Sequence, residues 1–370
     1  MNETLFSIFR NDNLEATENL SKAFESSWKS PSNIALVKYW GKKGQQLPAN
    51  PSLSLTLTEA YTETSVKAIP ADMKSGIKTL NKDPNHPFIP KLQTLLNWVS
   101  AEIHELSAFA FEIETRNTFP HSAGIASSAS GISAFALCLL DIAYSVLNMP
   151  VDNDKFRQLA SFAARIGSGS ACRSVVPGYS LWGETGLVSG SSDYFAVEIN
   201  SSVHPYFTGL CDAILMVSSE PKSLASTAGH SQMNIHPYSK ARIAQANQNI
   251  QNVLSALQQG DIEKLSGIVE NEALSLHALI MSAETGTILM APGTVELIHQ
   301  IRKARQSGLP LFFTLDAGPN VHLLYPASHS VEAGKYINEN LAPLCEKNRV
   351  IFDHGGKGPE RLFSGVLNLC

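Results

Sequence analysis

Charge and cysteine are both scarce in this sequence. Only 16% of the 370 residues are Asp, Glu, Lys or Arg, and the formal net charge is −5 at pH 7. Because nucleic acids and membrane surfaces usually bind a basic field, neither is expected as a partner. The five cysteines are widely spaced and include no C-x-x-C pair, which fits a reducing compartment and indicates no zinc site. Because the chain is acidic as a whole, any anionic ligand must bind at a local cluster of basic residues.

Several familiar signals are also missing. The N-terminal stretch "MNETLFSIFRNDNLEATENL" carries acidic residues around a very short apolar core, unlike a secretory signal. The longest apolar run, "ISAFALCLLDIAYSVL", is interrupted by Asp141 and Ser145, which favours a buried helix over a membrane span. No H-E-x-x-H or G-x-S-x-G pattern occurs, which argues against metallopeptidases and serine hydrolases. We expect a cytoplasmic protein.

The order of the elements predicts a layered α+β protein. No internal repeat is present, and runs typical of strands alternate with runs typical of helices. A polar stretch near residue 205 divides the chain into two expected domains, 1–205 and 206–370. Besides two strands near the N-terminus, we expect strands at 109–115, 194–200, 213–219, 311–316, 321–326 and 349–353, and helices near 90–105, 130–147, 153–165, 238–258, 260–281 and 294–306.

The segment "SLSLTLT" (52–58) alternates leucine with small hydroxyl side chains. This period of two is typical of a half-buried strand. Its polar face would line a cleft or, at least as readily, face the solvent on an antiparallel sheet.

The preceding strand, "NIALVKYWGKK" (33–43), places a lysine on an apolar face. Alternation puts Lys38 on the same side as Leu36. By pattern alone, an edge-strand lysine whose stem reaches water is the better explanation, and a partner anion would reverse that preference. Tyr39 points the other way and Lys42 follows the Gly41 turn, so the segment can build a basic site on an acidic protein.

The segment "PHSAGIASSASG" (120–131) consists mostly of small residues and leads into an apolar helix. Unpaired amides at a helix N-terminus favour anions, and small side chains let a phosphate approach the backbone. Ser127, Ser128 and Ser130 offer hydroxyl donors or a magnesium ligand. A serine-capped helix packed tightly through Ala and Gly explains the segment equally well. The Gly-Lys-Ser/Thr ending of a Walker A loop is missing.

A second small-residue segment is "RIGSGSACRS" (165–174). It is no dinucleotide fingerprint, because Cys172 stands where the last glycine should be. Ser168 and Ser170 remain as hydroxyl donors, and the guanidinium group of Arg173 can donate two hydrogen bonds to a carboxylate or phosphate. Taken alone, a glycine-rich turn with a surface arginine is the better interpretation.

The third segment, "LFFTLDAGPNVHLLYP" (311–326), consists of two apolar runs around a tight turn. The first run delivers Asp316 to the end of a strand. Asp beside Gly more commonly caps a turn through its side chain. A catalytic role needs a substrate proton within reach and a cation nearby, for which Lys38 is a candidate.

Together these segments resemble the GHMP superfamily of small-molecule kinases and, within it, the diphosphomevalonate decarboxylases. The match covers four separated segments in the right order, across roughly residues 30–360, and the ordered set is far more specific than any single motif. The resemblance implies a two-domain α+β fold with mixed or antiparallel sheets layered with helices around a deep cleft. It also implies a homodimer that converts 5-diphosphomevalonate, with ATP and Mg²⁺, into isopentenyl diphosphate, CO₂, ADP and phosphate.

The resemblance assigns roles to residues of this chain. Asp316 would deprotonate or orient the substrate 3-hydroxyl, Lys38 would neutralise charge around it, and Arg173 would clamp the substrate carboxylate. The other groups expected to bind the substrate and its diphosphate tail are Tyr39, Lys42, Ser168, Ser170, Lys222 and Ser226. Those expected at the ATP phosphates are Ser122, Gly124, Ala126, Ser127 and Ser128, with Mg²⁺ on Ser127 and Ser128.

Three alternatives stay open at this point. A decarboxylase of 5-phosphomevalonate would differ only in the groups that bind the phosphate tail. A mevalonate kinase should lack a working pair of Asp316 and Arg173. A silent ligand-binding homologue would need no combination of Asp316, Lys38 and Arg173.

Overall fold

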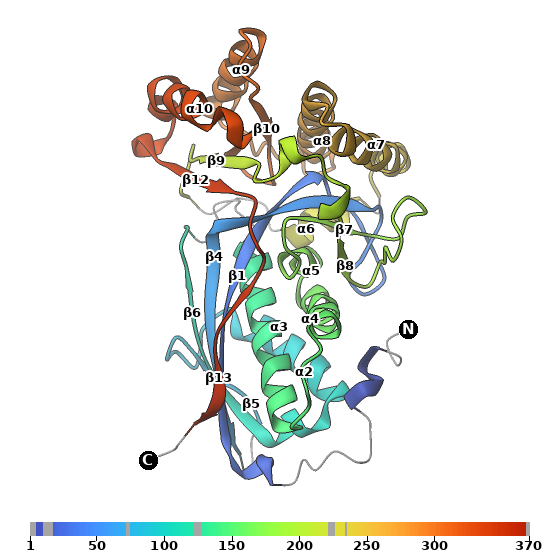
Figure 1. Ribbon diagram of the computed structural model, residues 1–370, viewed down its shortest axis with the longest axis vertical. Helices are drawn as coiled ribbons and strands as arrows, with labels where there is room; N and C mark the ends of the chain where they lie inside the picture. The colour runs from blue at the N-terminus through green and yellow to red at the C-terminus, as the bar shows by residue number, and fades with distance from the viewer. Residues whose placement is uncertain are drawn as a thin grey trace.

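The computed structural model describes residues 5–9, 18–71, 75–120, 127–220, 226–233 and 235–367. Two β-sheets form its framework, and helices pack against both of them (Figure 1). The strands are β1 (Ala23–Val37), β2 (Lys42–Lys43), β3 (Leu47–Pro48), β4 (Ser52–Pro70), β5 (Gly76–Leu80), β6 (Phe109–Asn117), β7 (Tyr179–Trp182), β8 (Ala196–Glu198), β9 (Cys211–Leu215), β10 (Phe312–Thr314), β11 (Val321–Tyr325), β12 (Val350–His354) and β13 (Glu360–Leu367). The α-helices are α2 (Ile89–Glu102), α3 (Ser127–Val146), α4 (Asn153–Gly167), α5 (Ala171–Ser174), α6 (Ser226–Gln232), α7 (Ser239–Gln259), α8 (Ile262–Ser282), α9 (Pro292–Gln306) and α10 (Ser330–Tyr336).

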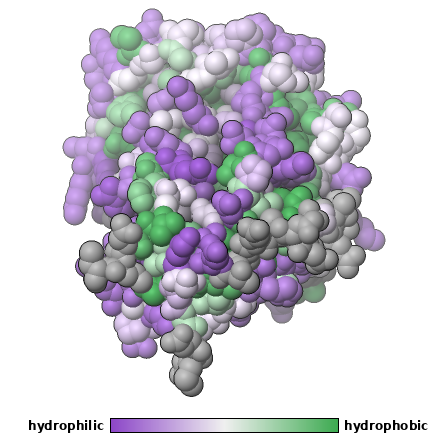
Figure 2. Space-filling view, turned by 60° about the horizontal axis from the view of Figure 1, so that its bottom comes forward, coloured by the Kyte–Doolittle hydropathy of each residue, from purple (hydrophilic) through white to green (hydrophobic). Residues whose placement is uncertain are grey.

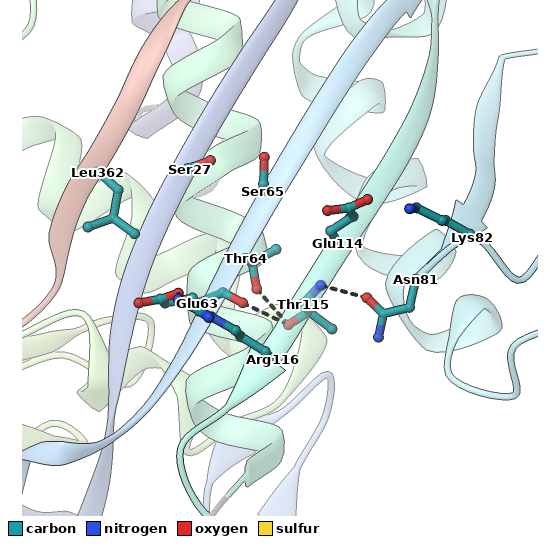
Figure 3. A pocket seen from close by; sticks show the side chains of 10 residues that line it. All are labelled: Ser27, Glu63, Thr64, Ser65, Asn81, Lys82, Glu114, Thr115, Arg116 and Leu362. Carbon is teal, nitrogen blue, oxygen red and sulfur yellow. Dashed lines mark hydrogen bonds and ion pairs between the residues drawn. The ribbon is translucent and has the colours of Figure 1, made fainter.

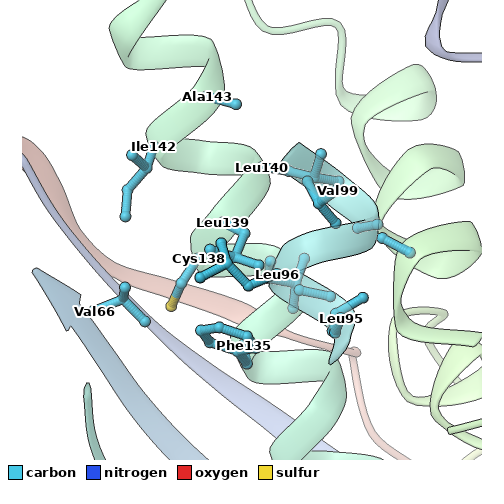
Figure 4. Packing of buried hydrophobic residues seen from close by; sticks show 14 of the residues in the cluster. Val66, Leu95, Leu96, Val99, Phe135, Cys138, Leu139, Leu140, Ile142 and Ala143 are labelled. Carbon is cyan, nitrogen blue, oxygen red and sulfur yellow. The ribbon is translucent and has the colours of Figure 1, made fainter. Parts of the chain in front are cut away.

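The first sheet has the strand order β13-β1-β4-β6-β5, with β7 and β8 joined to β4. Its pairs are antiparallel except β5 with β6. Helices α2, α3 and α4 cover one face (Figure 1). Helix α3 is apolar around nearly its whole circumference, so it lies in the core, where Leu139 and Leu140 pack against Leu96 and Val99 of α2 (Figure 4).

The second sheet has the order β10-β11-β9-β12 and is antiparallel throughout. One face packs on α9 and α10, and the other shares a core with β1, β4, α7 and α8. Asp353 of β12 ties the two sheets together, because its carboxylate accepts hydrogen bonds from the amides of Thr58, Glu59 and Ala60 at 2.7–2.9 Å. The chain then returns to the first sheet as β13.

All six expected helices are confirmed within a few residues, and each of the expected strands coincides with an observed one. Several stretches of the first sheet were not anticipated: the first half of β1, the second half of β4, and strands β5, β7 and β13. From 52 to 56 the hydroxyl face does not face solvent, because Ser52, Ser54 and Thr56 are all fully buried.

Helix α3 is long and apolar enough to cross a membrane by length and composition, yet 89% of its apolar window is buried inside the protein. A core helix passes the same test. The face of the molecule shown in Figure 2 intersperses hydrophilic and hydrophobic residues.

Candidate active site

A cavity opens where β1 ends, α3 begins and the turn after β10 meets the 167–173 loop. Its described lining contains four cationic side chains, Lys38, Lys42, Lys91 and Arg173, and one carboxylate, Asp316. This excess of positive charge supplies the local basic site that an acidic protein needs for an anion. Lys91, at the start of α2, carried no signal in the sequence.

Lys38 and Asp316 form an ion pair in this cavity, with 3.0 Å between Nζ and Oδ1. Lys38 is 2% exposed, whereas Asp316 is 28% exposed and faces the cavity. The edge-strand interpretation of Lys38 is therefore wrong, and the partner anion is Asp316. Burial lowers the pKa of Lys38. Burial alone would raise the pKa of Asp316, but the neighbouring cations, Lys38 foremost, hold it below its ordinary value, so the carboxylate is anionic at neutral pH.

The turn that carries Asp316 is fixed from behind by other segments. The Nε2 of His277 on α8 lies 3.0 Å from the backbone carbonyl of Asp316, and Asn320 exchanges two hydrogen bonds with the backbone of Ser218, at 2.9 and 3.0 Å. Burial lowers the pKa of His277, so the ring is neutral and donates its Nε2 proton to that carbonyl. His277 was missed because a single histidine on a helix gives no local signal.

The backbone of Lys38 is fixed in the same way. Its amide donates to Glu272 at 2.8 Å, and its carbonyl accepts from Asn50 at 3.1 Å. Glu272 is fully buried and pairs with Arg242, whose Nη1 and Nη2 donate to it at 2.8 and 2.5 Å. Both ends of the ion pair between Lys38 and Asp316 thus rest on buried partners from α7 and α8.

Arg173 extends from the short helix α5 beneath the cavity. Its Nη1 donates to the Oγ of Ser52 at 2.7 Å, which gives this buried hydroxyl a hydrogen-bond partner. Nε of Arg173 and the hydroxyl of Tyr39 are both buried without a hydrogen-bond partner among the described residues. Buried polar groups are normally satisfied, so these two atoms suit a bound polar ligand.

Ser168 and Ser170 also line the cavity, and between them Gly169 leaves room for Tyr39. A Cβ at Gly169 would lie 2.7 Å from the Tyr39 hydroxyl and 2.8 Å from Trp182.

We expect Gly169→Ala to lower kcat/KM about 10²-fold, the scale on which small misplacements of a binding group act. Steady-state kinetics would measure it. Gly267→Ala is the matched control, because nothing lies within 4 Å of its Cβ position, and an equal loss in both variants would contradict this expectation.

Helix α3 points its first turn at the same cavity, where Ser127 and Ser128 contribute to the wall. Ser127 also borders an adjacent hollow lined by His86, Phe88 and Leu92. The described residues hold no group of three or more His, Cys, Asp or Glu side chains suited to a metal. Two serine hydroxyls nevertheless suit Mg²⁺, which keeps water and phosphate oxygens as ligands and needs few from the protein.

Several expected site residues cannot be placed in this geometry. Ser122, Gly124, Ala126 and Lys222 lie outside the described residues, and Ser226 begins α6 with a side chain that is not described.

A different hollow lies over β1, β4 and β6 (Figure 3). Its charged lining comprises Glu63, Glu114, Lys82 and Arg116, and Glu63 pairs with Arg116. Its charges balance, so it lacks the cationic excess of the cavity around Asp316.

Two family models match most of this chain. The diphosphomevalonate decarboxylase-like N-terminal domain matches residues 30–194, and the mevalonate 5-diphosphate decarboxylase C-terminal domain matches residues 213–359. Diphosphomevalonate decarboxylase from Debaryomyces hansenii is 31% identical over 322 residues, which are 82% of this chain and 79% of that protein.

Two solved structures share the fold. MDDEF in complex with MVAPP, AMPPCP and magnesium has a TM-score of 0.77 and 28% identity, over 92% of this chain and 99% of that one. Mevalonate diphosphate decarboxylase from Staphylococcus aureus has a TM-score of 0.78 and 26% identity, over 93% and 99%. The expected two-domain α+β fold is confirmed, and the chain belongs to the diphosphomevalonate decarboxylase family.

Proposed function

We propose that the protein is a diphosphomevalonate decarboxylase, which uses ATP and Mg²⁺ to convert (R)-5-diphosphomevalonate into isopentenyl diphosphate, CO₂, ADP and phosphate in the mevalonate route to isoprenoids. The observation that carries the proposal is the ion pair between the buried Lys38 and Asp316, which faces one cationic cavity together with Arg173. A relative with the same fold binds MVAPP, AMPPCP and magnesium. A silent binding protein would gain nothing from a fixed, anionic Asp316.

The proposed reaction begins at the tertiary 3-hydroxyl of the substrate, which is a poor leaving group until phosphorylated. Asp316 would accept its proton or orient it toward the γ-phosphoryl group of ATP. A carboxylate with a lowered pKa is a weak base, so orientation and charge contribute alongside proton removal. Lys38 would hold Asp316 in place and offset the negative charge gathered by two polyphosphates.

As the phosphate leaves, the bond that joins the carboxylate to the rest of the substrate breaks. The electrons of that bond form the alkene, and the carboxylate leaves as CO₂. Arg173 would hold that carboxylate through its unpartnered Nε, with Ser168 beside it. Tyr39, Lys42 and Ser170 would bind the diphosphate tail, and Lys222 and Ser226 are proposed to complete that site.

The nucleotide would lie at the start of α3. Its phosphates would meet the free amides of that helix and the hydroxyls of Ser127 and Ser128. Ser122, Gly124 and Ala126 are proposed to complete the phosphate loop. When bound, Mg²⁺ would supply charge neutralisation between the phosphates, with Ser127 and Ser128 as its protein ligands.

The test offers purified protein mevalonate, 5-phosphomevalonate and 5-diphosphomevalonate separately, each with ATP and Mg²⁺, and counts ADP and CO₂. We expect matched release of both from the diphosphate alone. Matched release from the monophosphate would favour the monophosphate-specific decarboxylase, ADP without CO₂ would identify a kinase, and no product from any substrate would favour a silent binder.

A cytoplasmic homodimer, without nucleic-acid or membrane partners, is part of the same proposal, as is the domain division near residue 205. The edge strand β13 exposes Leu362, Phe363 and Val366, and apolar edges favour association with another chain. Light scattering would measure the mass in solution, and a monomer at all concentrations would contradict the dimer.

A further inference from the structure

Lys42 reaches the cavity from a very small hairpin. Strands β2 and β3 contribute two residues each, and an isolated two-stranded hairpin is marginally stable at best in water. The position of Lys42 therefore depends on anchors outside the hairpin. One anchor lies at the tip, where Nη1 of the buried Arg165 donates to the carbonyl of Gln45 at 2.7 Å.

The second anchor lies at the base of the hairpin, at Gly41. The carbonyl of Gly41 accepts from the amide of Ala49 at 3.3 Å, and its own amide donates to Nδ1 of His230 at 3.1 Å. The φ of Gly41 is +100°, a conformation that favours glycine. Because an amide N–H only donates, Nδ1 of His230 carries a lone pair, and the ring is the neutral tautomer with its proton on Nε2.

His230 is buried within the cavity wall rather than on the surface. It lines the same cavity as Asp316, and its ring lies 4.3 Å from the Tyr39 ring and 4.8 Å from the Trp40 ring, measured between centroids. Met233, the residue directly after helix α6, makes a separate contact with this segment by packing with Trp40. Removing the acceptor of His230 should therefore leave α6 in place.

We propose that His230 is a positioning residue for the diphosphate end of the substrate. Its Nδ1 fixes the Gly41 amide, and through that peptide it sets Tyr39 on one side and Lys42 on the other against the cavity. The identity of the ligand rests on the proposed function, whereas the contact between His230 and Gly41 does not.

The test compares His230→Asn with His230→Gln. The side-chain oxygen of Asn stands close to the position of Nδ1, whereas the amide of Gln reaches the position of Nε2. For the Gln variant we expect a Kd for 5-diphosphomevalonate, measured by calorimetry, about 2- to 12-fold weaker, which corresponds to about 0.5–1.5 kcal/mol for one hydrogen bond. The Asn variant should bind nearly as the unmodified protein does, and ATP affinity should change in neither. A role limited to filling space predicts that Gln, which is nearer to His in size, binds at least as tightly as Asn, and that result would overturn the proposal.

A second measurement needs no substrate. Hydrogen exchange in segment 40–43 of the ligand-free protein should be slow in the unmodified protein and in His230→Asn, and faster in His230→Gln and His230→Phe. The Phe variant keeps a ring between Tyr39 and Trp40 without an acceptor, so it decides the matter if the Gln variant does not fold. Equal exchange in all variants would overturn the inference. Failure of the unmodified protein to bind 5-diphosphomevalonate would instead contradict the proposed function, and the exchange data would still test His230.

Discussion

Asp316→Asn should lower kcat by at least about 10²–10⁴-fold, the usual range for removing a general base. The amide keeps the shape of the side chain but loses the negative charge that meets Lys38 at 3.0 Å and cannot accept the substrate proton. Single-turnover release of ADP and CO₂ from 5-diphosphomevalonate would measure the loss. Since the lowered pKa keeps Asp316 ionised at neutral pH, the loss should persist across neutral pH.

Asp141→Asn is the matched control for this variant. Asp141 is also a buried carboxylate, but it accepts from Ser26 at 2.7 Å and pairs with Arg361 of β13 at 2.9 Å, at the first sheet. It should lower stability and leave kcat nearly unchanged. A kcat for Asp316→Asn within a few-fold of the unmodified protein would contradict the role proposed for this residue.

Glu272→Gln should lower the free energy of unfolding by about 3–5 kcal/mol, the cost of breaking a buried ion pair by removing one partner. Arg242 and Glu272 are 2% and 0% exposed, so neutralising Glu272 leaves a buried guanidinium without its counter-charge. Urea unfolding would measure the change. Catalysis should suffer as well, because Glu272 also holds the Lys38 amide.

Glu270→Gln, on the same helix, is the control for Glu272→Gln. Glu270 is similarly buried, but its partners Arg302 and Arg305 are 42% and 21% exposed. Water can solvate those guanidinium groups after the carboxylate is lost, so the expected cost is smaller, about 1 kcal/mol. Equal losses of unfolding free energy in the two variants would show that burial of the arginine partner does not determine the cost.

The sequence alone predicted the parts of this protein that depend on residues close together in the chain. Helical periodicity located all six expected helices, because the apolar stripe of a helix can be recognised from the few turns of sequence that form it. The small residues before α3 and the turn after β10 indicated ligand-binding segments, and their order along the chain identified the family.

The sequence did not show which groups the two faces of β1 and β4 contact. Alternation showed which side chains share a face, but it could not show what lies opposite. The lysine on the apolar face suited a strand edge, and the hydroxyls of 52–58 suited solvent. The fold instead placed Asp316 against Lys38 and Arg173 against Ser52, and each contact joins two polar groups that burial would otherwise leave unsatisfied.

The residues that the sequence did not reveal are the supports of the site. Glu272 reaches the Lys38 amide across 234 positions of the chain, and His230 reaches Gly41 across 189. A lone histidine or glutamate on a helix has no local pattern that separates it from an ordinary surface residue. From residue order, the sequence by itself determined the helices and the family. Only the tertiary structure decided which buried charges and acceptors meet, because that depends on how two distant sheets pack and on which polar groups their contact removes from water.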